Sequence, residues 1–269
     1  MGVNPMFEEQ YIQILAALVQ QGERVETRNG PVRKLPFLNV AFDARYLPLL
    51  HSRKTFYKGI AGEYAAFLRG PHTKYDFRKF GCNYWDDWAD EYGDLNVDYG
   101  NAWIDFNGVN QIDNVIDSIR NDPHGRRHII SGWDPSNLES LSLPCCHHFY
   151  QFYVRDDTYL DLLWNQRSVD WAIGCPADAV LATIMLHTFA NATGYNAGVV
   201  KMSFGDCHVY ENHVEQAQEQ LARVAQMEDY ELIEFSVKNR KKIYDFIPAD
   251  VVVSSDYKPM KAIKYELNI

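Results

Sequence analysis

The sequence has no long apolar run and no targeting segment, and both absences narrow the classes of protein to consider. No stretch approaches the ~20 consecutive apolar residues that a membrane-spanning helix needs, so no membrane span is predicted. The N-terminal residues MGVNPMFEEQ lack a basic segment followed by an apolar one, so no signal peptide is expected. Met6 stands where a myristoylation signal has Ser or Thr, so a lipid anchor is not expected either.

Cysteines are few, and their spacing is not that of a disulfide framework or a zinc site. They are Cys82, Cys145, Cys146, Cys175 and Cys207. Adjacent cysteines cannot easily bridge each other, and the chain has no CxxC pair. The sequence therefore predicts a reduced, cytosolic protein without a metal site.

The chain also lacks an excess of positive charge. Its formal net charge is −10 at pH 7, whereas proteins that bind long nucleic acids usually carry a basic face. A nucleic-acid polymer is therefore not expected as a partner. A small anion held by a few local arginines is compatible with this charge.

What the sequence has is material for one sizeable folded domain. It contains 269 residues, 46% hydrophobic and 14% aromatic, without repeats, low-complexity tracts or linkers. Apolar spacings of three and four predict helices over 7–21 (ending at Gly22), 56–69, 111–123, 178–192 and 208–226. Alternating β-rich segments predict strands within 26–50 and over 126–133, 147–154 and 198–206, with a hairpin turn at 155–158 leading into YLDLLWNQ. This order predicts a single α+β domain, residues 1–269, with a large, mostly buried mixed sheet flanked by helices.

The segment SLPCCHHFYQFYV (142–154) places a thiol between a turn proline and a histidine, just before a strand. Such a thiol can act as a nucleophile if a nearby cation lowers its pKa. It can equally be a small buried hydrophobic residue. A Cys–His hydrolase is less well supported, because sequence adjacency does not place the histidine across the site.

Three further segments carry groups that suit a phosphate monoester and its sugar. Arg126, Arg127 and Arg167 have planar guanidinium groups that match phosphate oxygens, although surface ion pairs are the alternative. In GDCHVYENH, His208 and Tyr210 lie on one face if the segment is extended, so both can contact one ligand.

Glu63 and two tryptophans are candidates for proton transfer and ring stacking. Glu63 lies in the apolar helix GEYAAFL, where burial would raise its pKa, although a partly exposed helix carboxylate is the commoner case. Trp85 and Trp88 lie among acidic residues and can stack on a flat ring or simply pack in the core.

Together these segments resemble the thymidylate synthase family over nearly the whole chain. The matching motifs, in the family's order, are WDDWADEYGDLNVDYGNAW, IRNDPHGRRHIISGWDP, LSLPCCHHFYQFYV, NQRSVDWAIGCP, GDCHVYENH and IYDF. The resemblance implies a thymidylate synthase-like fold and a homodimer. It also implies transfer of one carbon from 5,10-methylenetetrahydrofolate to carbon 5 of a pyrimidine nucleoside monophosphate.

The resemblance also implies roles for individual residues. Cys146 would be the nucleophile that adds to carbon 6 of the ring, in a field of arginines that favours its thiolate. Glu63 would be the acid/base carboxylate that organises water. The residues implied to bind the nucleotide are Arg28, Arg126, Arg127, Arg167 and Ser168 at the phosphate, His208 and Tyr210 at the 3′-hydroxyl, and Gln166 and Asp178 elsewhere on the substrate. Those implied to bind folate are Asp170, Trp85, Trp88 and Tyr244. Arg126 and Arg127 would reach the site of the other subunit.

The chain departs from the family's pattern at three positions. Cys145 replaces a proline, Asn165 stands where an aromatic residue is common, and Asp178 in PAD replaces the asparagine of PFN. An asparagine amide matches the carbonyl and N–H of uracil, whereas an aspartic acid can accept from the amine of cytosine and place a proton at ring nitrogen 3. An unmatched buried polar edge costs roughly 1–3 kcal/mol. Deoxycytidylate hydroxymethylases carry the same replacement, although a carboxylate at a helix start also serves as a cap.

The sequence therefore predicts a one-carbon transferase acting on a pyrimidine nucleotide, with dCMP hydroxymethylase as the leading hypothesis. It would act in the cytoplasm, that of the host if a phage encodes it. The alternatives are a dCMP methyltransferase that yields dihydrofolate, a thymidylate synthase acting on dUMP, a CMP hydroxymethylase, and an inactive nucleotide- or RNA-binding relative. Trp85 and the terminal Ile269 resemble a synthase, whereas the tail AIKYELNI is longer than a synthase tail.

Overall fold

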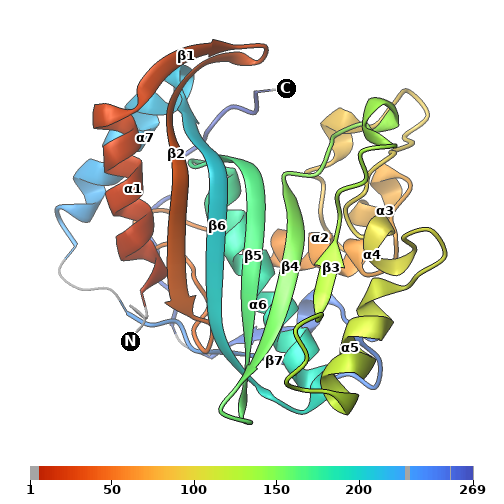
Figure 1. Cartoon of the computed structure of the whole chain (residues 1–269). Helices are drawn as coiled ribbons and strands as arrows, with labels where there is room; N and C mark the ends of the chain where they lie inside the picture. The colour runs from red at the N-terminus through yellow and green to blue at the C-terminus, as the bar shows by residue number, and fades with distance from the viewer. Residues whose placement is uncertain (1–5, 228–230, 255, 269) are drawn as a thin grey trace.

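A six-stranded mixed sheet forms the centre of the molecule (Figure 1). The computed structural model describes residues 6–227, 231–254 and 256–268. The sheet has the order β1-β2-β6-β5-β4-β3, in which β5 and β6 are parallel and the other neighbours are antiparallel. Its strands are β1 (Glu23–Thr27), β2 (Gly30–Asp43), β3 (Ile129–Ser131), β4 (His147–Arg155), β5 (Tyr159–Asp170) and β6 (Asn196–Tyr210).

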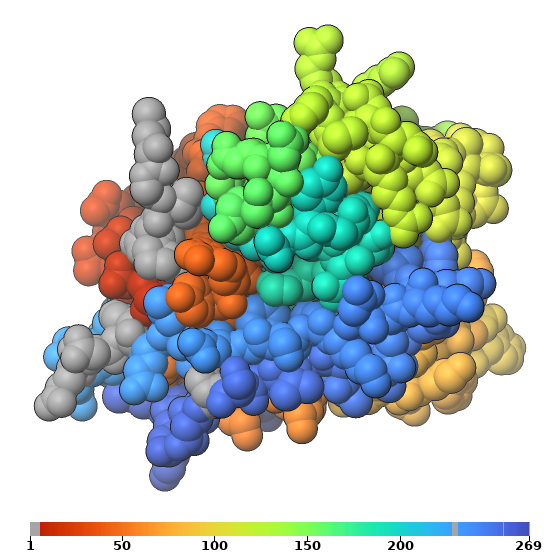
Figure 2. All heavy atoms as spheres, turned by 90° about the horizontal axis from the view of Figure 1, so that it is seen from below, coloured from red at the N-terminus to blue at the C-terminus, as the bar shows by residue number. Residues whose placement is uncertain are grey.

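Helices cover one face of this sheet, and a small second sheet lies near its lower end (Figure 1). The helices are α1 (Phe7–Gln21), α2 (Tyr57–Phe67), α3 (Lys74–Arg78), α4 (Asn101–Ile104), α5 (Gln111–Asn121), α6 (Gly174–Thr193) and α7 (Val214–Val224). Short 3₁₀ turns are η1 (Asp86–Trp88), η2 (Leu138–Ser140), η3 (Glu211–His213), η4 (Ile243–Asp245) and η5 (Pro248–Asp250). The second sheet pairs β7 (Phe235–Val237) with β8 (Val251–Val253). From below, the C-terminal part of the chain forms a band beside α6 (Figure 2).

Helix α6 is apolar on most sides because it is enclosed by the sheet and by other helices. It packs against β5, β6, α2 and α5. It begins at Gly174, four residues before the predicted start, because Pro176 lies in the first turn, where a missing N–H has no cost. None of the described helices combines the length and apolarity needed to cross a bilayer.

Strand β6 is longer than predicted, and the helix that follows it starts later. The sequence predicts a helix over 208–226, but residues 208–210 belong to β6 and α7 begins at Val214. Backbone pairing of His208 with both Lys34 and Asp170 keeps this end of the strand extended. Tertiary pairing here overrides the helical spacing of the apolar residues.

The sequence around α1 and around the turn between β4 and β5 predicted the positions of these elements correctly. Helix α1 matches the predicted range and ends at Gly22, where a Cβ atom would lie 2.4 Å from the Leu18 carbonyl oxygen. The hairpin between β4 and β5 turns at Asp156 and Asp157, whose φ angles of 54° and 48° are typical of a type I′ turn. Strand β3, by contrast, is much shorter than the predicted 126–133.

None of the described helices covers the other face of the sheet (Figure 1). On β4, the side chains of Tyr150 and Phe152 point into the core, whereas Tyr153 is 63% exposed. Leu163 of β5 is only partly buried. The prediction of a mostly buried sheet is therefore wrong for one face of the isolated chain.

Candidate active site

The candidate site lies where β5 and β6 end and where β4 begins. Because β5 and β6 are parallel, their carboxyl ends meet at one edge of the sheet. The register pairs Ser168 with Asp206 and Asp170 with His208. Gln166 of β5 faces α6, where its side-chain amide contacts Asp178; beyond Gln166 the buried position shifts to Val169, and Ser168 and Asp170 are only partly buried.

Cys146 lies immediately before β4, and Arg167 of β5 holds the turn that carries it. The Arg167 guanidinium donates to the carbonyl oxygens of Pro144 and Cys145, each at 2.9 Å, and its Nη2 lies 3.9 Å from Cys146 Sγ. Cys146 is partly exposed, whereas Cys145 is buried and its thiol donates to the Gly132 carbonyl oxygen at 3.1 Å. Cys146 is therefore the accessible thiol of the pair.

The pKa of the Cys146 thiol reflects opposing effects. Burial raises this pKa, the Arg167 charge and a Tyr99 hydrogen bond lower it, and the Asp178 carboxylate raises it again, with a net increase. Arg126 and Arg127 are exposed on the loop between α5 and β3. The Arg167 charge therefore favours the thiolate as expected, but burial outweighs it, and the contribution of Arg126 and Arg127 from another subunit stays a prediction.

His147 is not the partner of a Cys–His hydrolase pair. Its ring is buried, and Nδ1 lies 2.5 Å from the Tyr150 hydroxyl. Burial lowers the pKa of His147 to about 3, so the ring is neutral at physiological pH. A neutral, enclosed imidazole does not supply the cation that activates a hydrolase thiol.

Asp178 does not cap its helix. Because α6 begins at Gly174, Asp178 lies in the second turn, and Asp170 instead accepts from the backbone N–H groups of Ala172 and Ile173 at 2.8 and 3.2 Å. Gln166 Nε2 donates to Asp178 Oδ2 at 2.6 Å. The capping alternative is therefore wrong, and the carboxyl of Asp178 meets the amide of a strand residue in the site.

Two acidic side chains, Asp178 and Glu63, retain protons at unusually high pH. Burial raises the pKa of Asp178 to about 7, although the hydrogen bond from Gln166 opposes this. Burial raises the pKa of Glu63 to about 8, opposed by Trp85 and reinforced by Asp178. Trp85 Nε1 donates to Glu63 Oε1 at 2.7 Å. Groups with pKa values near neutrality can give and take protons at physiological pH.

A histidine and a tyrosine at the end of β6 form the opposite side of the site. The rings of His208 and Tyr210 are perpendicular, with centroids 5.3 Å apart. Burial raises the pKa of Tyr210, and the charge of Arg28 in the β1–β2 turn opposes this, so Arg28 lies within electrostatic range. His208 Nδ1 lies 2.9 Å from Asp206 Oδ1.

Trp88 and Asp170 suit a flat, polar ring system, whereas Trp85 is 5% exposed and stacks on Phe77 with ring centroids 5.1 Å apart. The indole rings of Trp85 and Trp88 lie 6.1 Å apart, and Trp88 is only partly buried. The Asp170 carboxylate can accept N–H donors of a heterocycle. The Tyr244 hydroxyl contacts Asn110 and Asp113 at the start of α5. Its role at the folate stays a prediction.

Comparison with known proteins agrees with this geometry. The family model of thymidylate synthase matches residues 9–269. A probable thymidylate synthase of Escherichia phage T5 is 35% identical over 232 residues, 80% of this chain and 83% of that protein. The thymidylate synthase of Brachyspira hyodysenteriae is 30% identical over 269 residues, 97% of this chain and 100% of that protein. The chain belongs to the thymidylate synthase family.

As a member of the thymidylate synthase family, the protein is an enzyme that transfers a one-carbon unit to carbon 5 of a pyrimidine nucleotide. Methylenetetrahydrofolate is the donor. The family resemblance and the fold predicted from the sequence are confirmed. The narrower resemblance to deoxycytidylate hydroxymethylases rests on Asp178 alone.

Sequence reasoning missed one residue beside the nucleophile. The Tyr99 hydroxyl accepts the backbone N–H of Cys146, and the Tyr99 ring lies 4.6 Å from that of His147. Tyr99 belongs to the motif VDYGNAW, which carries part of the thymidylate synthase resemblance. The motif indicated the family, but nothing in it identified Tyr99 as a residue of the site.

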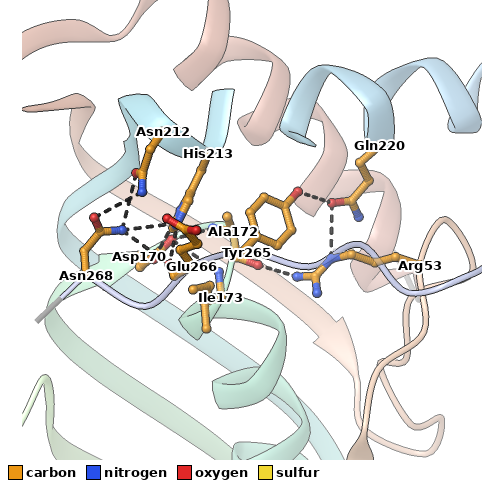
Figure 3. A network of polar contacts seen from close by, with 10 residues as sticks. All are labelled: Arg53, Asp170, Ala172, Ile173, Asn212, His213, Gln220, Tyr265, Glu266 and Asn268. Atoms are coloured by element: carbon orange, nitrogen blue, oxygen red, sulfur yellow. Dashed lines mark hydrogen bonds and ion pairs between the residues drawn. The ribbon is translucent and has the colours of Figure 1, made fainter. Parts of the chain in front are cut away.

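A second missed group joins the C-terminal segment to the site (Figure 3). The Tyr265 hydroxyl and Arg53 Nε both donate to Gln220 Oε1 at 3.2 Å. His213 Nε2 lies 2.7 Å from the Glu266 carbonyl oxygen, and Nδ1 lies 3.8 Å from Asp170 Oδ2. The tail of this thymidylate synthase family member therefore packs beside a predicted folate residue.

Proposed function

We propose that the protein is a deoxycytidylate hydroxymethylase, which converts dCMP, methylenetetrahydrofolate and water to 5-hydroxymethyl-dCMP and tetrahydrofolate. The observation that carries this proposal is the position of Asp178. Its carboxyl lies within hydrogen-bond distance of Gln166 and within electrostatic range of Cys146 and Glu63. The residue that departs from the family's pattern thus lies beside the proposed nucleophile.

A protonated Asp178 matches the edge of cytosine. Its carbonyl oxygen accepts from the exocyclic amine, and its hydroxyl donates to ring nitrogen 3. A pKa near 7 makes this proton available at physiological pH. Proton transfer to the ring nitrogen draws electrons from carbon 6, which promotes addition of the Cys146 thiolate.

The remaining residues bind and orient the nucleotide. Arg167 and Ser168 hold the phosphate with Arg28, while His208 and Tyr210 bind the sugar hydroxyl. The Arg167 guanidinium already contacts the turn that carries Cys146, so an anion bound by Arg167 lies close to the nucleophile. Glu63 carries the proton exchanged with the base and orders water near carbon 5. The folate supplies the one-carbon unit and lies against Trp85, Trp88 and Asp170.

We also propose that the enzyme is a homodimer formed through the uncovered face of the sheet. This face includes partly exposed apolar side chains of β4 and β5, such as Tyr153 and Leu163. Burial of apolar surface drives such association. Arg126 and Arg127 are exposed and free to reach the phosphate in the partner's site.

The decisive experiment incubates the enzyme with methylenetetrahydrofolate and dCMP, dUMP or CMP in parallel. Product mass and the absorbance of dihydrofolate are recorded together. A hydroxymethyl product from dCMP without dihydrofolate is expected. A methyl product with dihydrofolate identifies a dCMP methyltransferase, and turnover of CMP in place of dCMP identifies a ribonucleotide enzyme; either result contradicts the proposal.

A thymidylate synthase acting on dUMP is the second candidate. A protonated Asp178 can also donate to the carbonyl at carbon 4 of uracil and accept from its N–H. Both relatives described above are named thymidylate synthases. Under the leading proposal, Asp178→Asn shifts the ratio of kcat/KM values towards dUMP by at least about tenfold, because an asparagine amide mismatches cytosine. An unchanged ratio would show that Asp178 does not read the base.

A further inference from the structure

We propose that Asp206 is a positioning residue that fixes the orientation and tautomer of the His208 ring, so that His208 Nε2 accepts a hydrogen bond from the sugar 3′-hydroxyl. This inference rests on the proposed binding of a nucleotide between His208 and Tyr210. It adds a residue, Asp206, that the sequence did not indicate as functional.

The geometry places the Asp206 carboxylate against one nitrogen of the imidazole. Asp206 Oδ1 lies 2.9 Å from His208 Nδ1, and both residues belong to β6. The His208 side chain is only 14% exposed, whereas that of Asp206 is 42% exposed. The ring is therefore held by its neighbours, while the carboxylate remains accessible to solvent.

The ionisation of Asp206 decides which nitrogen carries the proton. The hydrogen bond from His208 and the nearby charge of Lys34 hold the pKa of Asp206 below its usual range. Lys34 Nζ lies 3.6 Å from Asp206 Oδ2. An ionised carboxylate only accepts hydrogen bonds, so Nδ1 must donate. In the neutral ring, Nε2 then carries a lone pair.

An acceptor at Nε2 complements a hydroxyl group. The sugar 3′-hydroxyl donates to His208 Nε2 and can at the same time accept from the Tyr210 hydroxyl, whose ring lies perpendicular to the imidazole. A sugar that lacks this hydroxyl leaves both protein groups without that partner. Asp206 thus acts on the nucleotide only through His208.

The test compares dCMP with 2′,3′-dideoxycytidine monophosphate, which lacks the 3′-hydroxyl. Asp206→Ala should raise the KM for dCMP about tenfold, the effect expected of one hydrogen bond, with kcat little changed. The KM for the dideoxy nucleotide should stay as in the wild type. Asp206→Asn keeps an acceptor beside Nδ1 and should retain most of the dCMP affinity.

Lys34→Met is the matched control. It removes the cation beside Asp206 but leaves the contact between Asp206 and His208, so the preference for dCMP over the dideoxy nucleotide should persist. A loss in Asp206→Ala that is equal for the two nucleotides, or that Lys34→Met reproduces, would overturn the role of Asp206. Absence of nucleotide binding in the wild type would instead overturn the proposed function, and this inference with it.

A spectroscopic measurement reads the tautomer in the wild-type enzyme itself. ¹⁵N–¹H correlation of the ring nitrogens, with His208 identified by the loss of its signals in His208→Gln, reports which nitrogen is protonated. The wild type should show the Nδ1–H tautomer of His208. An Nε2–H tautomer in the wild-type enzyme contradicts the proposal.

Discussion

At the scale of single residues, burial gives Asp178 and Glu63 their chemistry. Both carboxyl groups lie in a mostly apolar region between the sheet and α2 or α6, where the charged form is poorly solvated. Their pKa values therefore rise to about 7 and about 8. A raised pKa lets these acids transfer protons near neutral pH, and it also makes the stability of the folded state depend on pH.

Asp178→Asn tests this sensitivity. Because the pKa of Asp178 is raised in the folded state, the wild type holds a proton that the unfolded chain loses above about pH 4. The contribution of Asp178 to wild-type stability should therefore fall between pH 4 and about 7, and the variant should gain roughly 2–4 kcal/mol relative to the wild type over that range.

Chemical denaturation at several pH values measures this difference. Asp117→Asn is the control, because the Asp117 side chain is 70% exposed. A similar pH dependence of the stability difference in both variants would contradict the role of burial at Asp178.

The adjacent cysteines Cys145 and Cys146 differ in exposure to solvent, because only Cys146 is partly exposed. Cys146→Ser should reduce exchange of the hydrogen at carbon 5 of the nucleotide by at least about a thousandfold, because a serine hydroxyl is a far weaker nucleophile than a thiolate. Cys145→Ser should retain most of the activity, since its hydroxyl can still donate to the Gly132 carbonyl. Tritium release from carbon 5 measures both. Activity lost only in Cys145→Ser would reverse the assignment.

At the scale of elements, a buried glutamine joins parts of the chain that are distant in sequence. Gln220 of α7 accepts from Tyr11 of α1 at 3.4 Å, and from Arg53 and Tyr265 at 3.2 Å each. Its Nε2 donates to Ser52 Oγ at 2.8 Å. Gln220 is therefore one of the contacts that attach the C-terminal segment to the core, together with the contact between His213 and the Glu266 carbonyl oxygen (Figure 3).

Gln220→Leu should weaken this attachment. Loss of the shared acceptor leaves buried donors unpaired, at a cost of ~1–3 kcal/mol in the free energy of unfolding. The KM for the folate should rise more than that for the nucleotide, because the tail lies beside Asp170. Gln218→Leu, on the exposed side of the same helix, is the control. A KM change equal for both substrates would contradict a specific link between the tail and the folate site.

At the scale of the whole molecule, the sheet face without helices is the proposed interface with a second copy of the chain. Each site would then contain Cys146 from one protomer and Arg126 from the other. Equal mixing of the inactive Cys146→Ser and Arg126→Ala variants, with subunit exchange, should restore about a quarter of wild-type activity, since half of the dimers contain one intact site.

Sedimentation of the wild type provides the accompanying measurement and should give the mass of a dimer. A monomer, or a mixture that stays inactive although the subunits exchange, would contradict the shared site.

Structural features set by neighbouring residues could be predicted from the sequence, whereas features set by contacts between distant segments could not. Helix α1 and the Asp156–Asp157 hairpin follow from neighbouring residues and were predicted correctly. The end of β6 was wrong, because pairing of His208 with two strands decides it. The start of α6 was also misplaced, and with it the idea that Asp178 caps the helix.

The sequence by itself determined the family, the order of the chemical groups along the chain, and the replacement of an amide by a carboxyl at position 178. Only the tertiary structure decided which cysteine is accessible, that Tyr99 lies beside it, and that the Asp206 carboxylate contacts the His208 ring. The physical reason is that residue types are written in the chain, whereas burial and hydrogen-bond partners depend on contacts between distant segments. Those contacts set the pKa of each group, and so the proton that Asp178 carries.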